Sequence, residues 1–295
     1  MQHFKDKTAF ITGAASGIGF GIARACVAAG MKVVITDVRA TALQSAASLL
    51  AERGNVVLPL LLDVTDRRQW LECADHVRNR FGSLDLLCSN AGVNFVGPTH
   101  KATYEDWDFA LGVNLGGAIN AVRTFAPPMI DSGRPGHIVI TSSVSGLFTG
   151  GGAGVYVTSK FALVGLAESL RADLRHTAIG VSVLCPGPVQ SELFESTQEV
   201  RPQRLAASGA EPIVSPGVAR SDTPIFRTAP TGTEIGELVL KGVERNELYI
   251  LTHAEIRPVL QARADALLAA LPTEPVSEAR ISAEAGLLDS SLYVA

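Results

Sequence analysis

A tyrosine and a lysine lie one helical turn apart in this chain, at Tyr156 and Lys160, and Ser143 precedes the tyrosine by thirteen residues. Residues i and i+4 share one face of a helix, so the ammonium and the phenol are expected to be neighbours. An ammonium about 4 Å from a phenol would favour the phenolate by up to roughly 4 kcal/mol at an effective dielectric near 20. We therefore predict a phenol of lowered pKa that exchanges a proton near neutral pH. The alternative is a partly buried tyrosine beside a solvated lysine.

A glycine-rich turn, Thr12–Gly19, follows the first apolar run and precedes a helical pattern. Glycines in such a turn let the backbone approach phosphate oxygens, and the helix that follows presents free N–H groups to them. The pattern favours a dinucleotide pyrophosphate, although an ordinary tight turn uses the same residues. The predicted phosphate-binding residues are Gly13, Ser16, Gly17, Ile18 and Gly19.

An aspartate, Asp37, ends the second apolar run, 24 residues after Gly13. A carboxylate there can accept hydrogen bonds from both hydroxyls of an adenosine ribose and would repel a 2′-phosphate. Arg39 is the one nearby cation, so we predict NAD rather than NADP as the cofactor. Asp37 could instead cap the following helix, and the two roles are compatible.

Two further turns follow apolar runs and carry residues suited to a nucleotide. Asp63 and Val64 follow the third run, where a carboxylate could meet the adenine amino group, or could equally be a helix-capping or turn aspartate. Asn90, Ala91 and Gly92 follow the fourth run, where small residues allow a cofactor to lie against the backbone. A plain turn would also use these residues.

Apolar, β-branched runs alternate with helical patterns along most of the chain, which predicts βαβ units and a doubly wound, Rossmann-like α/β fold of about seven parallel strands. The predicted strands are Lys7–Thr12, Lys32–Asp37, Val56–Leu62, Leu84–Ser89, His137–Ser142, Val181–Cys185 and Leu248–Leu251. The predicted helices are Gly17–Gly30, Ala40–Arg53, Arg67–Phe81, Thr103–Asp131, Val155–His176, Thr233–Arg245 and Glu255–Leu271.

The alternation weakens after Pro186, and the stretch Glu195–Thr231 contains five prolines with little periodicity. So long an irregular stretch is usually functional or disordered. We predict one domain over residues 1–271 with a substrate lid at about 188–231, and a tail, 272–295, whose order the pattern does not decide.

Composition excludes several classes of function. The 295 residues are 47% hydrophobic with a net charge of -4, so neither a disordered chain nor a nucleic-acid partner is expected. There is no run of 18 apolar residues and no N-terminal apolar segment, which predicts no membrane association, no secretion and a cytoplasmic location. The four cysteines are scattered and the six histidines form no cluster, so we expect buried thiols and no metal.

These motifs together resemble the short-chain dehydrogenase/reductase family, in its compact one-domain NAD-type subgroup. The matching residues occur in the family's order over about residues 5–250: Thr12-Gly13-x-x-x-Gly17-x-Gly19, Asp63, Asn90-Ala91-Gly92, Asn114, Ser143, Tyr156-x-x-x-Lys160 and Pro186-Gly187. Two departures are mild, since Ser89 replaces a common asparagine and Ser191 stands where threonine is usual.

The resemblance implies specific roles. Tyr156 is the acid/base, Lys160 lowers its pKa and binds the nicotinamide ribose, and Ser143 hydrogen-bonds the reacting oxygen. Asn114 holds a water that links Lys160 to solvent. The remaining cofactor contacts implied are Pro186, Gly187, Val189 and Ser191.

A narrower resemblance concerns the substrate. The chain is similar along nearly its whole length to bacterial dehydrogenases that oxidise the benzylic Cα alcohol of lignin-type β-aryl ethers. The segments that carry it include Phe20–Ala23, Thr103–Asp108, Ser132–Val139, Arg201-Pro202 and Glu247–Ile250. Most of these segments are scaffold, so they bear weakly on the substrate.

We therefore predict reversible NAD-dependent oxidation of a secondary alcohol, with a bulky aromatic substrate favoured. The predicted pocket walls are Asn94, Phe95, Val144, Phe148, Pro188 and Phe194, placed on loops after the fourth, fifth and sixth strands. Alternatives are a hydroxysteroid or other alicyclic alcohol dehydrogenase, a 3-oxoacyl-type ketoreductase, and a non-catalytic NAD-binding regulator. The family resemblance also implies a homodimer or homotetramer that pairs through the two long helices.

Overall fold

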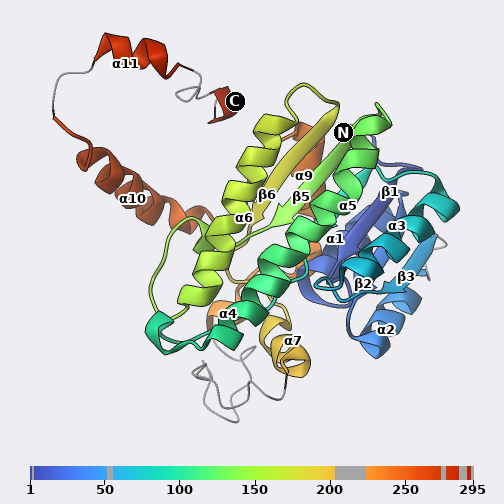
Figure 1. Cartoon of the computed structure of the whole chain (residues 1–295). Coiled ribbons are helices and arrows are strands. Elements are labelled where there is room, and N and C mark those ends of the chain that lie inside the picture. Colours follow the sequence, from blue (N-terminus) through green and yellow to red (C-terminus); the bar gives the residue numbers. More distant parts are fainter. Residues whose placement is uncertain (2, 52–55, 203–223, 274–276, 286–290, 294–295) are drawn as a thin grey trace. The chain divides into compact units, whose positions relative to one another are not determined.

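The computed structural model describes residues 1, 3–51, 56–202, 224–273, 277–285 and 291–293 of the chain. The chain divides into two compact units, Met1–His253 and Ala254–Ala295. The first unit holds the whole sheet and the helices that cover it (Figure 1). In the second unit, the described regular elements are all helices.

Seven parallel strands form a single sheet in the order β3-β2-β1-β4-β5-β6-β7. The strands are β1 Thr8–Thr12, β2 Lys32–Asp37, β3 Val57–Leu61, β4 Leu86–Ser89, β5 Gly136–Thr141, β6 Ile179–Cys185 and β7 Tyr249–Leu251. The order reverses between β1 and β4, which is where doubly wound sheets bind ligands at their carboxyl ends. The predicted fold class is confirmed, and each predicted strand is present to within two residues at either end.

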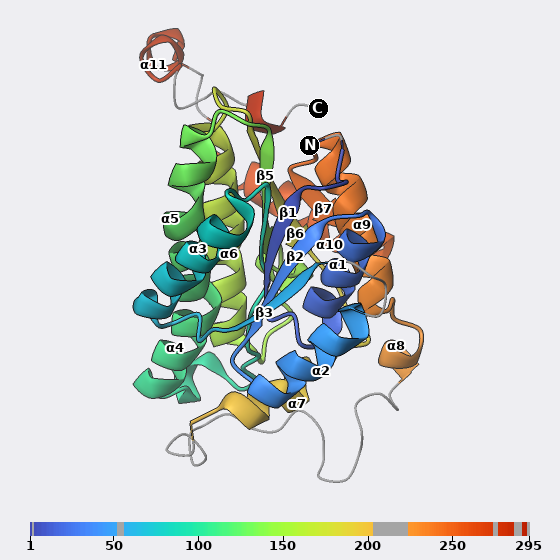
Figure 2. The same cartoon turned by 90° about the vertical axis from the view of Figure 1, so that its right-hand side faces the viewer.

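Helices cover both faces of the sheet, which Figure 2 shows edge-on. One face packs against α1 Gly17–Ala28, α2 Ala40–Ala51 and α9 Gly232–Arg245. The other packs against α3 Arg67–Phe81, α5 Gly117–Asp131 and α6 Gly154–Asp173. Burial on both faces explains why β1 is apolar or β-branched throughout and why all five of its residues are buried.

Aromatic side chains fill the second of these layers. The Phe10 ring lies 5.8 Å from Trp70 and 4.7 Å from Phe125, measured between centroids. In the first layer, glycines bring α1 and α9 into close approach, because a Cβ on Gly21 would lie 1.7 Å from the carbonyl oxygen of Gly232. This packing holds α1, and hence the turn that precedes it, in place.

The long helix predicted over Thr103–Asp131 is interrupted. The structure has α4 Tyr104–Leu111, a π-helical segment Gly112–Gly116, and then α5. A π segment inserts an extra residue into the helical ladder and is frequent at functional sites. Asn114 is at the centre of this segment and is buried.

The stretch predicted to be irregular, Glu195–Thr231, is partly helical. Helix α7 spans Leu193–Val200, and a short helix, α8, spans Pro224–Arg227. Both belong to the predicted lid, of which residues 203–223 lie outside the described part of the chain.

The second unit contains α10 Arg257–Ala269 and α11 Glu278–Ala283. Of the described helices, none combines the length and the hydropathy that a membrane crossing requires. The described residues also contain no group of three or more His, Cys, Asp or Glu side chains placed so that they could hold a metal ion. All four cysteine thiols are free and buried, and burial raises the pKa of Cys26 to about 12.

Candidate active site

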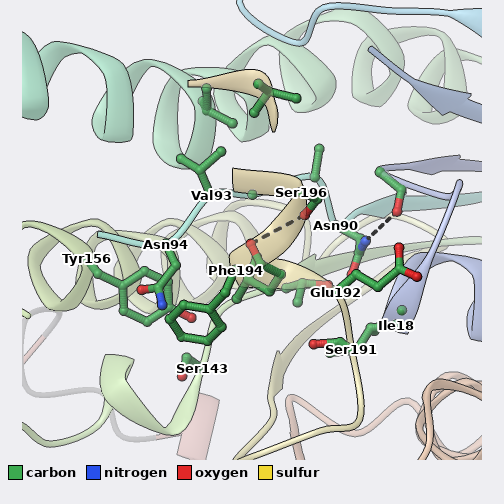
Figure 3. A pocket seen from close by; sticks show the side chains of 18 of the residues that line it. Ile18, Asn90, Val93, Asn94, Ser143, Tyr156, Ser191, Glu192, Phe194 and Ser196 are labelled. Carbon is green, nitrogen blue, oxygen red and sulfur yellow. Dashed lines mark hydrogen bonds between the residues drawn. The ribbon is translucent and has the colours of Figure 1, made fainter. Parts of the chain in front are cut away.

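A cavity of about 820 Å³ opens at the carboxyl ends of the strands. Its volume falls in the range of small-molecule and cofactor sites. Most of the residues predicted from the sequence line it, namely Gly13, Ser16, Gly17, Ile18, Asp37, Asp63, Val64, Asn90, Ala91, Gly92, Asn94, Ser143, Val144, Tyr156, Lys160, Pro186, Gly187, Pro188, Val189, Ser191 and Phe194. Figure 3 shows Tyr156, Ser143, Asn94 and Phe194 in one part of this cavity, and Ile18, Ser191 and Glu192 in another.

The glycine-rich turn has the backbone that an anion cradle needs. Gly13 and Gly17 have φ of 62° and 54°, a conformation that residues with a Cβ rarely adopt. Ser16 precedes α1, but its side chain makes no capping hydrogen bond and the first turn holds no acidic residue, so the helix N–H groups remain available to an anion. Gly19 does not line the cavity. A Cβ there would lie 2.2 Å from the Gly13 carbonyl oxygen, so its role is close packing.

Asp37 ends β2 and lies at the cavity wall with Arg39 folded against it. The Arg39 Nε lies 3.1 Å from Asp37 Oδ1, and the Ala15 N–H donates to Oδ2 at 3.2 Å. Arg39 also donates to Ser16 Oγ at 3.0 Å. Two glutamates flank the same guanidinium, Glu199 at 3.6 Å and Glu192 at 3.9 Å. Arg39 is therefore surrounded by three carboxylates, and the local charge is negative.

Asp63 and Asn90 line the cavity and also hold local structure. Asp63 Oδ1 accepts from the Thr65 N–H at 2.9 Å and from the Thr65 hydroxyl at 2.8 Å, as a turn aspartate does. Asn90 Nδ2 donates to the Thr12 carbonyl at 3.0 Å and thereby ties the end of β4 to the end of β1. The Asp63 contacts match the turn alternative, whereas Asn90 joins two strands rather than forming a plain turn, and both residues line the cavity.

Tyr156 and Lys160 lie on the first two turns of α6, and Ser143 follows the end of β5. The Lys160 Nζ lies 5.4 Å from the centroid of the Tyr156 ring and donates to the Thr141 carbonyl at 3.2 Å. Ser143 Oγ accepts from the Ser145 N–H at 3.1 Å and donates to the Pro186 carbonyl at 3.4 Å. All three side chains face the same cavity.

Burial is the main influence on the pKa values of Tyr156 and Lys160. It raises the pKa of Tyr156, and a hydrogen bond with Ser143 offsets part of that rise. Burial also lowers the pKa of Lys160 to about 8. The expectation that the ammonium would lower the phenol pKa is not met in the chain alone, because the same desolvation that keeps the phenol neutral also disfavours the ammonium. A buried amine of pKa near 8 is suited to passing protons at neutral pH.

Asn114 is held by the π segment against the loop after β4. Its Oδ1 accepts from the Val93 N–H at 2.8 Å, and its Nδ2 donates to the Val93 carbonyl at 3.1 Å and to Ser159 Oγ at 2.9 Å. Ser159 is adjacent to Lys160 in α6. Asn114 does not line the cavity but joins α4–α5, the loop after β4, and α6 from behind.

Two predicted pocket residues lie elsewhere. Phe95 is 4% exposed and packs with Ala110 and Val155 rather than facing the cavity. Its neighbours Val93, Asn94 and Val96 do line the cavity, so Phe95 alone in this segment turns away from it. Phe148 is partly buried and is likewise outside the cavity wall.

Helix α7 supplies cavity residues that the sequence analysis missed. They are Leu193, Ser196 and Val200, in addition to Phe194. The spacing of Leu193, Thr197 and Val200 is that of one helix face, which is the signal that predicts α7 once the prolines nearby are set aside. The cavity also includes Phe226 of α8 and Arg39.

Comparison with known proteins places these features in context. Residues 7–202 match the family model described as short chain dehydrogenase. The C alpha-dehydrogenase of Sphingobium sp. strain SYK-6 is 40% identical over 269 residues, which cover 91% of this chain and 87% of that protein. The 1-deoxy-11-beta-hydroxypentalenate dehydrogenase of Streptomyces avermitilis is 35% identical over 258 residues, which cover 86% and 87% of the two chains.

A solved structure is similar over nearly the whole chain. It is a short chain dehydrogenase/reductase from Burkholderia phymatum in complex with NAD, with 34% identity and a TM-score of 0.82. The match covers 94% of this chain and all of that one.

Proposed function

The chain belongs to the short-chain dehydrogenase/reductase family, and we propose that it is an NAD-dependent enzyme that interconverts a secondary alcohol and a ketone. The observation that carries the proposal is the placement of Tyr156, Lys160 and Ser143 in one cavity with the Gly13–Gly17 turn and Asp37. Acid/base groups and a phosphate cradle in one cavity are what hydride transfer to a dinucleotide requires.

The residues present fit a dinucleotide. The uncapped N-terminus of α1 and the two glycines of positive φ suit its pyrophosphate. Asp37 would accept from the hydroxyls of the adenosine ribose, and Lys160 would donate to those of the nicotinamide ribose. When bound, the cofactor supplies a nicotinamide ring that accepts the hydride from the carbinol carbon.

The chain's own groups handle the proton. In the oxidation, the phenolate form of Tyr156 takes the hydroxyl proton of the alcohol, while Ser143 donates a hydrogen bond to the same oxygen and holds it in place. The proton then leaves the phenol for solvent, while the positive charge of Lys160 favours the phenolate. Asn114 holds Ser159, the residue before Lys160, through a hydrogen bond to its hydroxyl. In the reduction, Tyr156 returns the proton to the oxygen as the ketone becomes the alcohol.

The charge around Arg39 supports NAD over NADP. Asp37, Glu192 and Glu199 place three carboxylates around a single guanidinium, so a 2′-phosphate would bring further negative charge to a region that is already negative. Steady-state rates with each cofactor test this point. A higher kcat/KM with NADP would overturn it.

The cavity wall supports a bulky aromatic substrate, a benzylic alcohol such as that of a lignin-type β-aryl ether. Val144, Pro188 and Phe194 give the cavity apolar and aromatic surface, and the Sphingobium relative carries the name C alpha-dehydrogenase. The test is a panel of benzylic, alicyclic and small aliphatic alcohols with NAD, followed by the absorbance of the reduced cofactor. Turnover of no alcohol would refute the reaction, and a preference for alicyclic alcohols would refute the substrate class.

The proposal includes a homo-oligomer that pairs through α4–α5 and α6, as the family resemblance implies. Ile119 on α5 is 46% exposed, which is compatible with such an interface. Light scattering after size-exclusion chromatography measures the number of subunits, and a monomer at working concentration would contradict it.

A further inference from the structure

Asn94 places an amide in the wall of a cavity that also presents the apolar side chains of Val96, Val144, Pro188, Leu193 and Phe194. Asn94 is partly buried, and no hydrogen bond joins its side-chain amide to any other residue in the described part of the chain. A polar group at a partly desolvated site is costly unless a partner satisfies it, and a ligand's polar atom is one such partner.

The backbone that carries this amide is rigidly held. The Asn94 N–H donates to Thr197 Oγ1 of α7 at 2.9 Å, and Thr197 is 4% exposed. The preceding residue, Val93, exchanges two hydrogen bonds with the Asn114 side chain. Binding groups held in this way lose little freedom when a ligand arrives.

The same segment runs beside the start of α6, where Tyr156 lies. The Gly97 N–H donates to the Gly152 carbonyl at 2.8 Å, and Gly97 pairs with Ala153 as an isolated parallel bridge. Phe95 packs in a cluster with Val155 that Tyr156 also contacts. Asn94 lines the cavity whereas Phe95 does not, and Figure 3 shows Asn94 in the same part of the cavity as Tyr156 and Phe194.

From this arrangement we infer that Asn94 determines specificity, because its side-chain amide donates a hydrogen bond to a second oxygen of the substrate on the carbon next to the carbinol. The inference rests on the proposed function, since it assumes an alcohol whose hydroxyl lies at Ser143 and Tyr156. The substrate class is then a benzylic alcohol with an ether or hydroxyl oxygen at the adjacent carbon. A site built around a hydrogen bond rejects an analogue that lacks the partner atom.

The test compares two alcohols of matched shape, 2-methoxy-1-phenylethanol and 1-phenylbutan-1-ol, in which a methylene replaces the ether oxygen. Both are assayed with the full-length chain and saturating NAD. We expect the wild-type kcat/KM to favour the ether by roughly tenfold, the worth of one hydrogen bond. In Asn94→Leu, which preserves size, the ratio should fall to about one. In Asn79→Leu, the same change at an exposed position of α3, the wild-type ratio should persist.

Asn94→Asp adds a directional test that does not depend on the leucine variant folding. A carboxylate accepts but does not donate, so this variant should lose the preference for the ether. It should still prefer 1-phenylethane-1,2-diol to 1-phenylbutan-1-ol, because the second oxygen of the diol carries a hydrogen that it can donate to the carboxylate.

The outcomes separate the two claims. Oxidation of neither alcohol by the wild type would refute the proposed function. Turnover of both, with the same ratio in the wild type and in Asn94→Leu, would refute the inference alone. The dissociation constant for NAD, measured by calorimetry without alcohol, should be unchanged in Asn94→Leu. A large loss of NAD affinity together with an unchanged substrate ratio would mean that the amide faces the cofactor, which also overturns the inference.

Discussion

Replacing Lys160 with methionine should stabilise the cofactor-free chain. Lys160 is 4% exposed, and burial lowers its pKa from 10.5 to about 8. The folded chain therefore holds a buried ammonium below pH 8, whereas the unfolded chain holds a solvated one up to about pH 10.5. At pH 7 this difference of about 2.5 pH units disfavours folding by roughly 3 kcal/mol.

Methionine removes that penalty and keeps most of the apolar length of the side chain. It also loses the hydrogen bond to the Thr141 carbonyl, worth about 1 kcal/mol, so the net gain at pH 7 is about 2 kcal/mol. The lowered pKa of Lys160 also determines how the stability difference between the two proteins changes with pH. Above pH 8 the folded wild type sheds its proton before the unfolded chain does, so its penalty is relieved as the pH rises from 8 to 10.5. The advantage of the variant should shrink by roughly 2 kcal/mol between pH 7 and pH 9.5.

Urea unfolding followed by tryptophan fluorescence measures the free energy of unfolding of both proteins at the two pH values, without NAD. Lys241→Met, at an exposed lysine of α9, is the control and should change the free energy by less than about 0.5 kcal/mol at either pH. A Lys160→Met protein that is less stable than the wild type at pH 7, or one whose difference from the wild type is the same at both pH values, would refute the reasoning. The stabilised variant should also have lost turnover, since the charge is retained for function at the expense of stability.

Three further predictions concern packing, the anchoring of α7 and pH. Gly21→Ala should destabilise the chain by about 1–3 kcal/mol in urea unfolding, because the new Cβ would meet the Gly232 carbonyl oxygen at 1.7 Å. Gly165→Ala on α6 is the control. Its Cβ would meet no described atom within 4 Å, so it should be neutral or stabilising by up to about 1 kcal/mol. Arg201→Met removes the cation 2.9 Å from Asp106, whose side chain is 1% exposed, and should reduce the free energy of unfolding by about 3 kcal/mol and raise the KM for alcohol. Arg68→Met, in an exposed ion pair, should change the free energy of unfolding by less than about 1 kcal/mol. Equal effects of the two changes would contradict a stabilising role of the buried Arg201–Asp106 pair. Because burial raises the pKa of Tyr156, the rate of alcohol oxidation should climb with pH from 7 toward 10, and a rate that is flat or falls over that range in steady-state assays would count against Tyr156 as the base.

The strands were predictable because both faces of a parallel sheet are buried, so each strand is a continuous apolar run that the sequence displays directly. The cavity residues that follow those strands were predictable for the same reason, since parallel strands bring their carboxyl ends to one edge. Asp37, Asn90 and Ser143 illustrate this, as each follows or ends a strand and each lines the cavity.

Features that depend on tertiary contacts were not predictable in the same way. The π segment around Asn114 is fixed by hydrogen bonds to Val93 and Ser159, which are distant in sequence. The inward orientation of Phe95 depends on its packing against Ala110 and Val155, which are distant in sequence. Burial raises the pKa of Tyr156, and the depth of the phenol in the fold is not visible in the sequence, which suggested a lowering by the neighbouring lysine.

Helix α7 was missed because the nearby prolines suggested an irregular segment. Its Thr197 is buried and its Glu199 approaches Arg39, so contacts with the rest of the fold help to hold the helix.

The central claim is that the Tyr156 hydroxyl exchanges the proton of the alcohol, and replacing that hydroxyl alone tests it most directly. In a single-turnover experiment with NAD and a benzylic alcohol that the wild type oxidises, Tyr156→Phe should form reduced cofactor more slowly by about 10²- to 10⁴-fold, the usual contribution of acid–base catalysis. Its dissociation constant for NAD should stay close to that of the wild type, which shows that the site is intact. Reduced cofactor formed at a rate near that of the wild type would contradict the account.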